Sequence, residues 1–222
     1  MAKVYLSPSD QESNVYAYDN TNEAVQCGRI AEACRAALER SGVEVKVGHM
    51  ISMAQKCSES NAFGADLHVP IHTNAFNGKV MGTRMFCYSS DGKGMTACKA
   101  IYARLAPITP GDSENIQVNA DYYEVRVPAA PTAYIECEFH DTVEGAKWIV
   151  ENTVLIGETI ARGICDYFGV KFVEKPKPVE PAADVLYRVQ IGAYKVKANA
   201  EKRLEEAKAA GFADAFIVTV KQ

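Results

Sequence analysis

Residues 65–75 have the sequence ADLHVPIHTNA, and this stretch decides the fold. Residues 65–71 are apolar with little polar interruption, the pattern of a strand in a parallel sheet that is covered on both faces. His72 follows directly, so its side chain projects from the carboxyl end of the strand, where ligands gather in open α/β sheets. The stretch therefore predicts a central strand with a functional side chain at its end. A hydrogen-bonded surface histidine is the alternative interpretation.

The sequence on either side alternates strand and helix patterns. In residues 20–40, apolar side chains recur at helical spacing and predict one buried stripe, formed by Ala24, Cys27, Ala31, Cys34 and Leu38. Strands are predicted at residues 3–6, 43–47, 83–88 and 132–139, and helices at 52–63, from 89 to about 105, and at 151–168. A loop rich in Pro and Asn covers 106–121. The alternation predicts an α/β fold, a twisted, mostly parallel sheet with helices on both faces.

A proline-rich segment divides the chain. Residues 171–184 contain Pro176, Pro178 and Pro181 with charged residues between them, which favours an extended linker. The predicted domains are thus residues 1–170 and a small module at 185–222. In the module, alternating residues 187–194, helix-forming residues 199–210 and β-branched residues 215–220 predict a βαβ unit.

Composition restricts the partners. The 222 residues carry a net charge of −4, which argues against nucleic acid as a partner. No segment approaches the roughly 20 apolar residues that a membrane span needs, so no membrane insertion is expected. The first residues lack the features of a signal peptide, so we expect synthesis in the cytoplasm. Seven cysteines without a C-x-x-C pair predict reduced, structural thiols.

Two histidines and one glutamate are candidates for a metal site. His68 and His72 lie on one face of the predicted strand, but about 13 Å apart along it, too far to share one ion. Glu23 opens the first long helix. It is either the third helical residue of a capping box with Asn20 as N-cap, or a metal ligand.

Two further carboxylates lie in the last predicted strand. Glu136 is flanked by apolar residues in YIECEF at residues 134–139. A carboxylate buried there needs a partner or a function, because burying it unpaired costs several kcal/mol. Glu138 lies about 7 Å further along the same face. The two form either a general-base site or a solvated strand end.

Three motifs in this order resemble one family. I-H-T-N at residues 71–74, T-N-E at 21–23 and A-P-T-A-Y-I-E at 130–136 resemble the zinc-dependent N-acetylmuramoyl-L-alanine amidases of bacterial cell walls and phage lysins. The resemblance covers most of residues 2–168. It implies that Glu23 and His72 bind Zn²⁺ and that Glu136 is catalytic. It also implies hydrolysis of the amide between muramic acid and the L-alanine of the peptidoglycan stem peptide.

The first turn departs from the family pattern. The family has a D-P-G-H-like turn that supplies a ligand histidine, whereas residues 7–11 are SPSDQ. Asp10 falls at the histidine position, and a carboxylate can bind zinc, so Asp10 is the predicted third ligand. His140 and a site completed by water are the alternatives. The departure also leaves two other functions open: a catalytically impaired, peptidoglycan-binding relative, or a zinc hydrolase of another amide.

The tail has a resemblance of its own. LYRVQIGAY at residues 186–194, followed by NAEKRL at 199–204, is similar to the sporulation-related (SPOR) repeat that binds peptidoglycan. Only one βαβ half is present, so the resemblance implies a homodimer formed through an exposed strand edge. A solubilising appendage is the alternative. With no signal peptide, the protein is expected to act at the cell wall after release through a holin pore or by lysis.

Overall fold

The computed structural model describes residues 1–114, 116–176 and 189–220. The chain divides into two compact units. The first unit comprises Met1–Lys175 and the second begins at Pro176. The first unit therefore ends five residues later than the boundary predicted at residue 170.

The first unit is built on a six-stranded sheet with the order β2-β1-β3-β6-β4-β5. All neighbouring strands pair in parallel except β4 and β6, which are antiparallel. The strands are β1 (Lys3–Pro8), β2 (Glu44–Val47), β3 (Leu67–Asn74), β4 (Arg84–Cys87), β5 (Gln117–Val118) and β6 (Tyr134–Phe139). The mostly parallel sheet predicted from the sequence is confirmed, with β3 at its centre.

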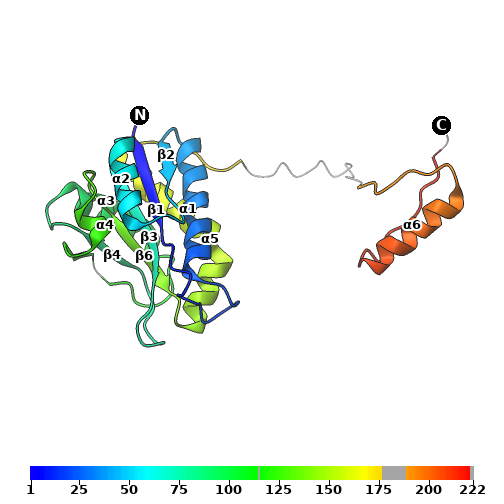
Figure 1. The fold of residues 1–222 in the computed structure, drawn as a ribbon, viewed down its shortest axis with the longest axis horizontal. Coiled ribbons are helices and arrows are strands. Elements are labelled where there is room, and N and C mark those ends of the chain that lie inside the picture. Colours follow the sequence, from blue (N-terminus) through cyan, green and yellow to red (C-terminus); the bar gives the residue numbers. More distant parts are fainter. Residues whose placement is uncertain (115, 177–188, 221–222) are drawn as a thin grey trace. The chain divides into compact units, whose positions relative to one another are not determined.

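Helices cover both faces of this sheet (Figure 1). The helices are α1 (Glu23–Arg40), α2 (Met53–Phe63), α3 (Lys93–Leu105), α4 (Tyr123–Arg126) and α5 (Val143–Phe168). α5 packs between α1 and α3 on one face, and α2 and α4 lie on the other. The approach of α1 to α5 is close, because a Cβ added at Gly157 would stand 2.5 Å from the Ile30 carbonyl oxygen.

The two faces of the sheet differ in chemistry. Along β3, Leu67, Val69 and Ile71 enter the apolar core beneath α1, α3 and α5. The alternate residues His68 and His72 lie on the opposite face, since successive side chains of a strand point to opposite sides. One face therefore stabilises the fold by apolar burial, and the other is free to carry polar groups.

Local hydrogen bonds set the helix starts. α1 begins at Glu23, because the Asn22 side chain accepts a hydrogen bond from the Val25 N–H. The alternative interpretation with Asn20 as N-cap was therefore wrong, since Asn20 lies in a turn with φ 45°. α5 begins at Val143, eight residues before the predicted start, and has non-helical dihedral angles at Asn152. The predicted start at residue 151 thus falls at this irregularity.

Residues 171–175 pack on the first unit instead of starting a free linker. Arg162 forms a bidentate ion pair with Glu174 at 2.6 Å, and its guanidinium lies 4.0 Å from the centre of the Phe172 ring. The Val173 N–H donates to Ser41 Oγ, and the Val173 carbonyl accepts from Arg40 Nε. These contacts tie the chain to α5 and to the end of α1. The rest of the predicted linker, from residue 177, lies outside the described residues.

The second unit contains helix α6 (Lys197–Ala209), which confirms the predicted helix. The predicted strands are not formed in the described residues 189–194 and 215–220, so that part of the βαβ prediction was wrong. Within α6 only Ala207 is buried. So small a segment has too little core to hold strands in place by itself.

Across the described part of the chain, no helix has the length and hydropathy needed to cross a membrane.

Candidate active site

Three polar side chains meet near the carboxyl ends of β3 and β6. His72 is on β3 and Glu136 on β6, and the strand register places these two residues directly opposite each other. Glu23 is the first residue of α1, and its carboxylate reaches His72. The fold thus brings together three of the four residues predicted for the site.

Glu23 and His72 form a buried, hydrogen-bonded pair. Glu23 Oε1 lies 3.0 Å from His72 Nδ1 and accepts from the Thr73 N–H, while Asn14 donates to Glu23 Oε2. Burial acts to raise the pKa of Glu23, but the contact with His72 and the hydrogen bonds from Asn14 and Ser9 together outweigh it, so the pKa is lowered. Burial acts to lower the pKa of His72, but Glu23 and the charge of Glu136 raise it. Each group therefore favours the charged form of the other, and Glu23 is the first residue of α1 rather than the third residue of a capping box.

Within the part of the chain that the structure describes, Glu136 is the member of the group with an unpaired buried oxygen. Its side chain is buried, and its Oε2 has no hydrogen-bond partner among the described residues. Burial raises its pKa to about 8, with Glu23 adding to the effect and His72 opposing it. A buried carboxyl group with a spare oxygen and a pKa near neutrality has the properties of a general acid or base.

Aromatic rings form one wall of the site. Tyr134 stacks on the His72 ring with 4.7 Å between centroids, and Tyr122 and Phe86 contact Tyr134 in turn. The stacked Tyr134 ring restricts rotation of the His72 imidazole. Its Nε2 has no partner in the described parts of the chain.

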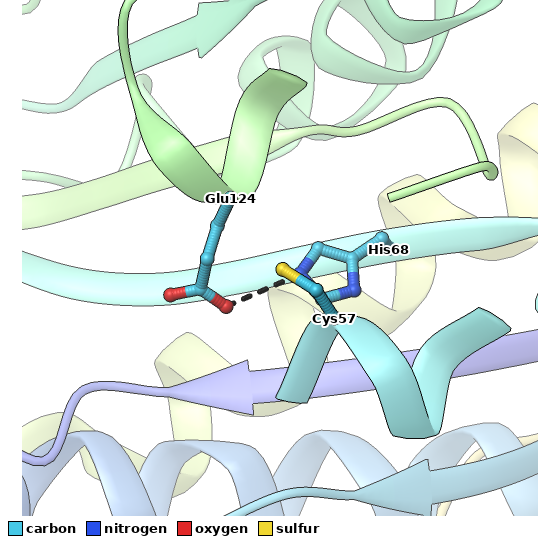
Figure 2. A group of neighbouring side chains, drawn as sticks. All are labelled: Cys57, His68 and Glu124. Atoms are coloured by element: carbon cyan, nitrogen blue, oxygen red, sulfur yellow. Dashed lines mark hydrogen bonds and ion pairs between the residues drawn. The ribbon is translucent and has the colours of Figure 1, made fainter. Parts of the chain in front are cut away.

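His68 lies on the same face of β3 as His72 but contacts a different carboxylate. Its Nε2 is 3.2 Å from Oε1 of Glu124 on α4 (Figure 2). The sequence pattern missed Glu124 because it follows a loop without apolar periodicity. The separation of the two histidines along the strand agrees with the prediction that they do not share an ion.

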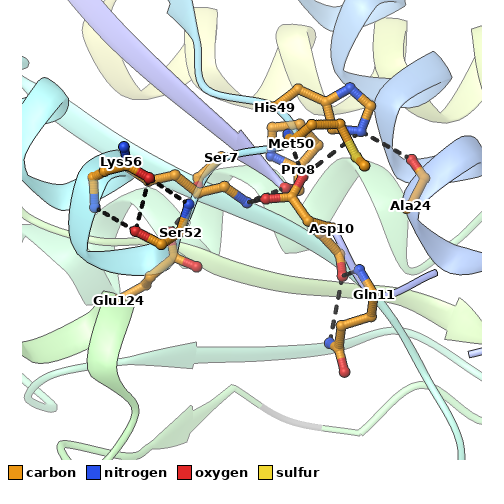
Figure 3. Close-up of polar contacts among 12 residues, drawn as sticks. Ser7, Pro8, Asp10, Gln11, Ala24, His49, Met50, Ser52, Lys56 and Glu124 are labelled. Atoms are coloured by element: carbon orange, nitrogen blue, oxygen red, sulfur yellow. Dashed lines mark hydrogen bonds and ion pairs between the residues drawn. The ribbon is translucent and has the colours of Figure 1, made fainter. Parts of the chain in front are cut away.

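Asp10 has partners other than His72 and Glu23. Its Oδ2 is 2.6 Å from Lys56 Nζ, and its Oδ1 accepts a 2.6 Å hydrogen bond from the Met50 N–H (Figure 3). Lys56 is itself buried and also donates to the Pro8 carbonyl. The carboxylate of Asp10 therefore neutralises a buried ammonium group and fixes the first turn.

Gln11 is a side chain of the first turn that reaches the site. Its Nε2 lies 3.5 Å from His72 Nδ1, and its Oε1 accepts from Asn14. The amide oxygen and nitrogen of glutamine are interchangeable by rotation about the last bond. Gln11 escaped the sequence analysis because an amide does not titrate and has no motif here.

His140 contacts Thr73, the residue that follows His72 on β3. Its Nδ1 lies 3.0 Å from Thr73 Oγ1 and 3.1 Å from the Thr73 carbonyl oxygen, and its ring stacks on Tyr16. Burial lowers its pKa, so the ring is neutral near pH 7. These contacts join the ends of β3 and β6.

Glu138 is the second buried carboxylate of β6. Its Oε1 accepts hydrogen bonds from the N–H groups of Gly82 and Phe139. Burial nevertheless raises its pKa to about 7, from an ordinary value of 4.5. The side chain thus belongs to the junction between β6 and the loop before β4.

Glu138→Gln should flatten the dependence of stability on pH. The folded protein binds the Glu138 proton more tightly than the unfolded chain, so this contribution to stability is complete below about pH 4.5 and is lost as pH rises through about 7. Between about pH 5 and pH 8, the wild type should lose roughly 1–3 kcal/mol more than the variant. Urea unfolding at both pH values measures this, and equal losses would contradict it.

Comparison with known proteins identifies the family. The sequence profile described as N-acetylmuramoyl-L-alanine amidase matches residues 9–166. The chain belongs to the N-acetylmuramoyl-L-alanine amidase family. The resemblance found in the sequence motifs is confirmed. The profile of the SPOR domain matches residues 173–222, which agrees with the resemblance seen in the tail.

Relatives and solved structures of this amidase family match most of the chain. The sporulation-specific N-acetylmuramoyl-L-alanine amidase of Bacillus subtilis strain 168 is 27% identical over 96% of this chain and 83% of its own length. The amidase CwlM of Bacillus licheniformis is 27% identical over 98% of this chain and 85% of its own length.

Among solved structures, the catalytic domain of the amidase CwlV from Bacillus (Paenibacillus) polymyxa var. colistinus superimposes with a TM-score of 0.70 at 17% identity, covering 77% of this chain and 100% of that one. An amidase from Clostridium difficile 630 gives 0.66 at 20% identity, covering 76% and 97%. These structures share the fold of the first unit.

Proposed function

We propose that the chain is an N-acetylmuramoyl-L-alanine amidase, which hydrolyses the amide between muramic acid and the L-alanine of the peptidoglycan stem peptide. Membership of the family supports the reaction class. The observation that carries the proposal is the buried Glu23–His72 pair beside Glu136, whose second carboxylate oxygen is unpartnered within the described residues. An imidazole–carboxylate pair beside a second, unpaired carboxylate provides groups that metal-assisted amide hydrolysis uses.

The residues present fit a zinc ion. Glu23 Oε1 and His72 Nδ1 are 3.0 Å apart. Two ligands of a tetrahedral zinc with bonds of about 2.0–2.1 Å stand roughly 3.3 Å from each other. The pair is thus close to ligand spacing before any ion binds. When bound, zinc supplies Lewis-acid polarisation of the substrate carbonyl and makes an attacking water more acidic.

The remaining steps are carried out by side chains of this chain. In its ionised form, Glu136 accepts a proton from the attacking water and passes it to the departing L-alanine nitrogen. Tyr134 holds the His72 ring in plane by stacking, and Glu23 fixes its orientation by hydrogen bonding. Glu136 is itself buried, which strengthens its interaction with charge that develops in the reaction.

The third ligand predicted from the sequence is Asp10. Its pairing with Lys56 favours a structural role, while Gln11 stands nearer to His72. An amide oxygen is a weaker zinc ligand than imidazole, so a site that uses Gln11 or water in the third position would bind zinc less tightly than a site with two histidines.

The products of digestion test the proposed reaction. Purified cell walls treated with the zinc-loaded protein should gain free L-alanine amino termini and no new reducing sugars. New reducing sugars would show cleavage of glycan bonds instead. New amino termini on other residues would indicate a hydrolase of a different amide. Binding to walls without any cleavage would support the impaired, peptidoglycan-binding relative.

For the tail we propose that it directs the enzyme to the cell wall. The match to the SPOR domain and the resemblance of residues 186–204 support this role. The predicted homodimer needs a strand edge, and residues 189–194 and 215–220 show none within the described part of the tail. We therefore propose only that the tail binds peptidoglycan, and we do not propose a homodimer.

Truncation after Lys175 should separate catalysis from targeting. This end point keeps the Arg162–Glu174 ion pair and the hydrogen bonds of Val173, so the first unit keeps its stability. Hydrolysis of soluble muropeptides should be unchanged. Hydrolysis of intact walls should fall by about 10-fold or more, because the tail raises the local concentration of enzyme at the wall.

A matched truncation after residue 170 is the control. It also removes Phe172, Val173 and Glu174, so it should lower thermal stability as well as wall lysis. If truncation after Lys175 abolishes hydrolysis of soluble fragments, the tail is part of the catalytic fold. If wall lysis is unaffected, the tail is no targeting module.

A further inference from the structure

A second group of side chains, of residue types that can ligate metals, lies on the polar face of the sheet, away from Glu23. Cys57 of α2, His68 of β3 and Glu124 of α4 point toward one another (Figure 2). One potential ligand atom from each residue lies within 4.8 Å of the other two. Their exposed fractions are 1%, 0% and 2%. Three separate elements therefore deliver sulfur, nitrogen and oxygen to one closed point.

The hydrogen bonds within the group leave some of its polar atoms unused. His68 Nε2 is 3.2 Å from Glu124 Oε1, and Ser7 Oγ donates to the same carboxylate oxygen. His68 Nδ1 is buried with no partner in the described residues. The His68 ring stacks on Tyr5, with 5.4 Å between centroids and 7° between planes, so it cannot turn freely. The His68 ring is therefore held in place, and the group contains a buried polar atom for which packing alone gives no reason.

A nucleophilic triad does not explain these residues. Burial and the neighbouring Glu124 raise the pKa of Cys57 to about 11, so the sulfur is a protonated thiol at neutral pH. A catalytic cysteine needs a thiolate and access for substrate. Cys57 has neither. Its place beside an imidazole and a carboxylate instead matches the ligand types of a closed transition-metal site.

We propose that Cys57, His68 and Glu124 bind a second divalent metal ion of the zinc class, in a structural site separate from the catalytic centre. The sulfur and imidazole donors favour zinc over calcium or magnesium, which take oxygen ligands. The fourth position is filled by water or by the hydroxyl of Ser7, which already contacts Glu124. On binding, the Cys57 thiol loses its proton to solvent and its sulfur bonds the metal as thiolate.

This site is independent of the Glu23–His72 pair. His68 and His72 are four residues apart on one extended strand, about 13 Å along its axis, while zinc bonds are about 2 Å long. No single ion can bridge them. The second site can therefore be tested separately from the proposed catalytic zinc.

The ion would fasten the only helix of the segment between β5 and β6. α4 has just four residues, and Glu124 is its buried acidic side chain. Joining Glu124 to α2 and β3 through a metal would hold α4 against the sheet. Because Tyr122 at the start of α4 contacts Tyr134, the same fastening would steady the aromatic wall beside His72.

Metal content and the spectrum of the cobalt form test the site in the full-length chain. The zinc-loaded wild type should carry two ions, and Cys57→Ala and His72→Ala one each. With Co²⁺ in place of Zn²⁺, the wild type and His72→Ala should show thiolate-to-cobalt absorption in the near ultraviolet, and Cys57→Ala should lose it. Cys34→Ala is the matched control, since Cys34 is equally buried in α1, and it should keep two ions and the absorption.

Glu124→Gln is a second variant that keeps the size of the side chain and its hydrogen bonds. It should also lower the affinity for the second ion, by about 10-fold or more, while circular dichroism confirms an intact fold. A wild type with one ion and no thiolate absorption, whose ion is lost in His72→Ala, overturns the second site and leaves the catalytic zinc standing. One ion that is lost in Cys57→Ala and kept in His72→Ala supports this site and contradicts the ligand pair Glu23–His72.

Discussion

Glu136→Gln should lower turnover of cell-wall substrate by about 10²-fold or more while zinc remains bound. The amide keeps the shape of the side chain but cannot accept a proton from water. The Glu136 side chain makes no hydrogen bond among the described residues, so the substitution breaks none. Initial rates on soluble muropeptides, with zinc content and melting temperature measured on the same samples, give the result.

Glu138→Gln is the matched control for this prediction. Both glutamates are buried on β6, but Glu138 is committed to the Gly82 and Phe139 N–H groups. Its variant should retain turnover within a factor of about 3. Near-normal turnover of Glu136→Gln, with a large loss in Glu138→Gln, would transfer the role of general base to Glu138.

His72→Ala should remove the catalytic zinc and with it all measurable amidase activity. The substitution deletes one of the two donors that stand 3.0 Å apart and leaves Glu23 as the sole remaining member of the pair. A single carboxylate holds zinc too weakly to retain it through purification. Elemental analysis should show one ion fewer per chain than in the wild type.

Asp10→Asn is the comparison for His72→Ala. If Asp10 serves Lys56 rather than zinc, the variant keeps its zinc and loses stability, because the buried ammonium group loses its counter-charge. Loss of zinc in Asp10→Asn with unchanged folding would instead establish Asp10 as the third ligand. Unchanged zinc in His72→Ala would refute the assignment of His72.

The strand pattern was sufficient to predict the sheet, since β3 and its neighbours are apolar on the core face and follow each other in regular alternation with helices. Two short elements were missed. β5 and α4 are two and four residues long, too short to show a period. The strands of the tail were predicted wrongly, because alternation indicates a strand only where a partner strand exists to pair with it.

The predicted residues that the structure brings together lie in regular elements. His72 comes at the end of an apolar strand, Glu136 within one, and Glu23 at a helix start. Asp10 was placed by position in a motif alone, and such a placement does not show which way a side chain turns. Lys56 decides that direction in the structure, and its partnership with Asp10 spans 46 residues.

The packing of residues 172–174 against Arg40 and Ser41 has a practical consequence. Arg40 is the last residue of α1 and Ser41 caps it, whereas Glu23 is its first residue. About 27 Å of helix therefore separates the point of attachment from the site. The polypeptide therefore leaves the first unit near the end of α1 opposite the Glu23–His72 pair. A foreign anchor, label or solid support joined after Lys175 would begin far from the Glu23–His72 pair. This junction is therefore suited to the exchange of whole modules.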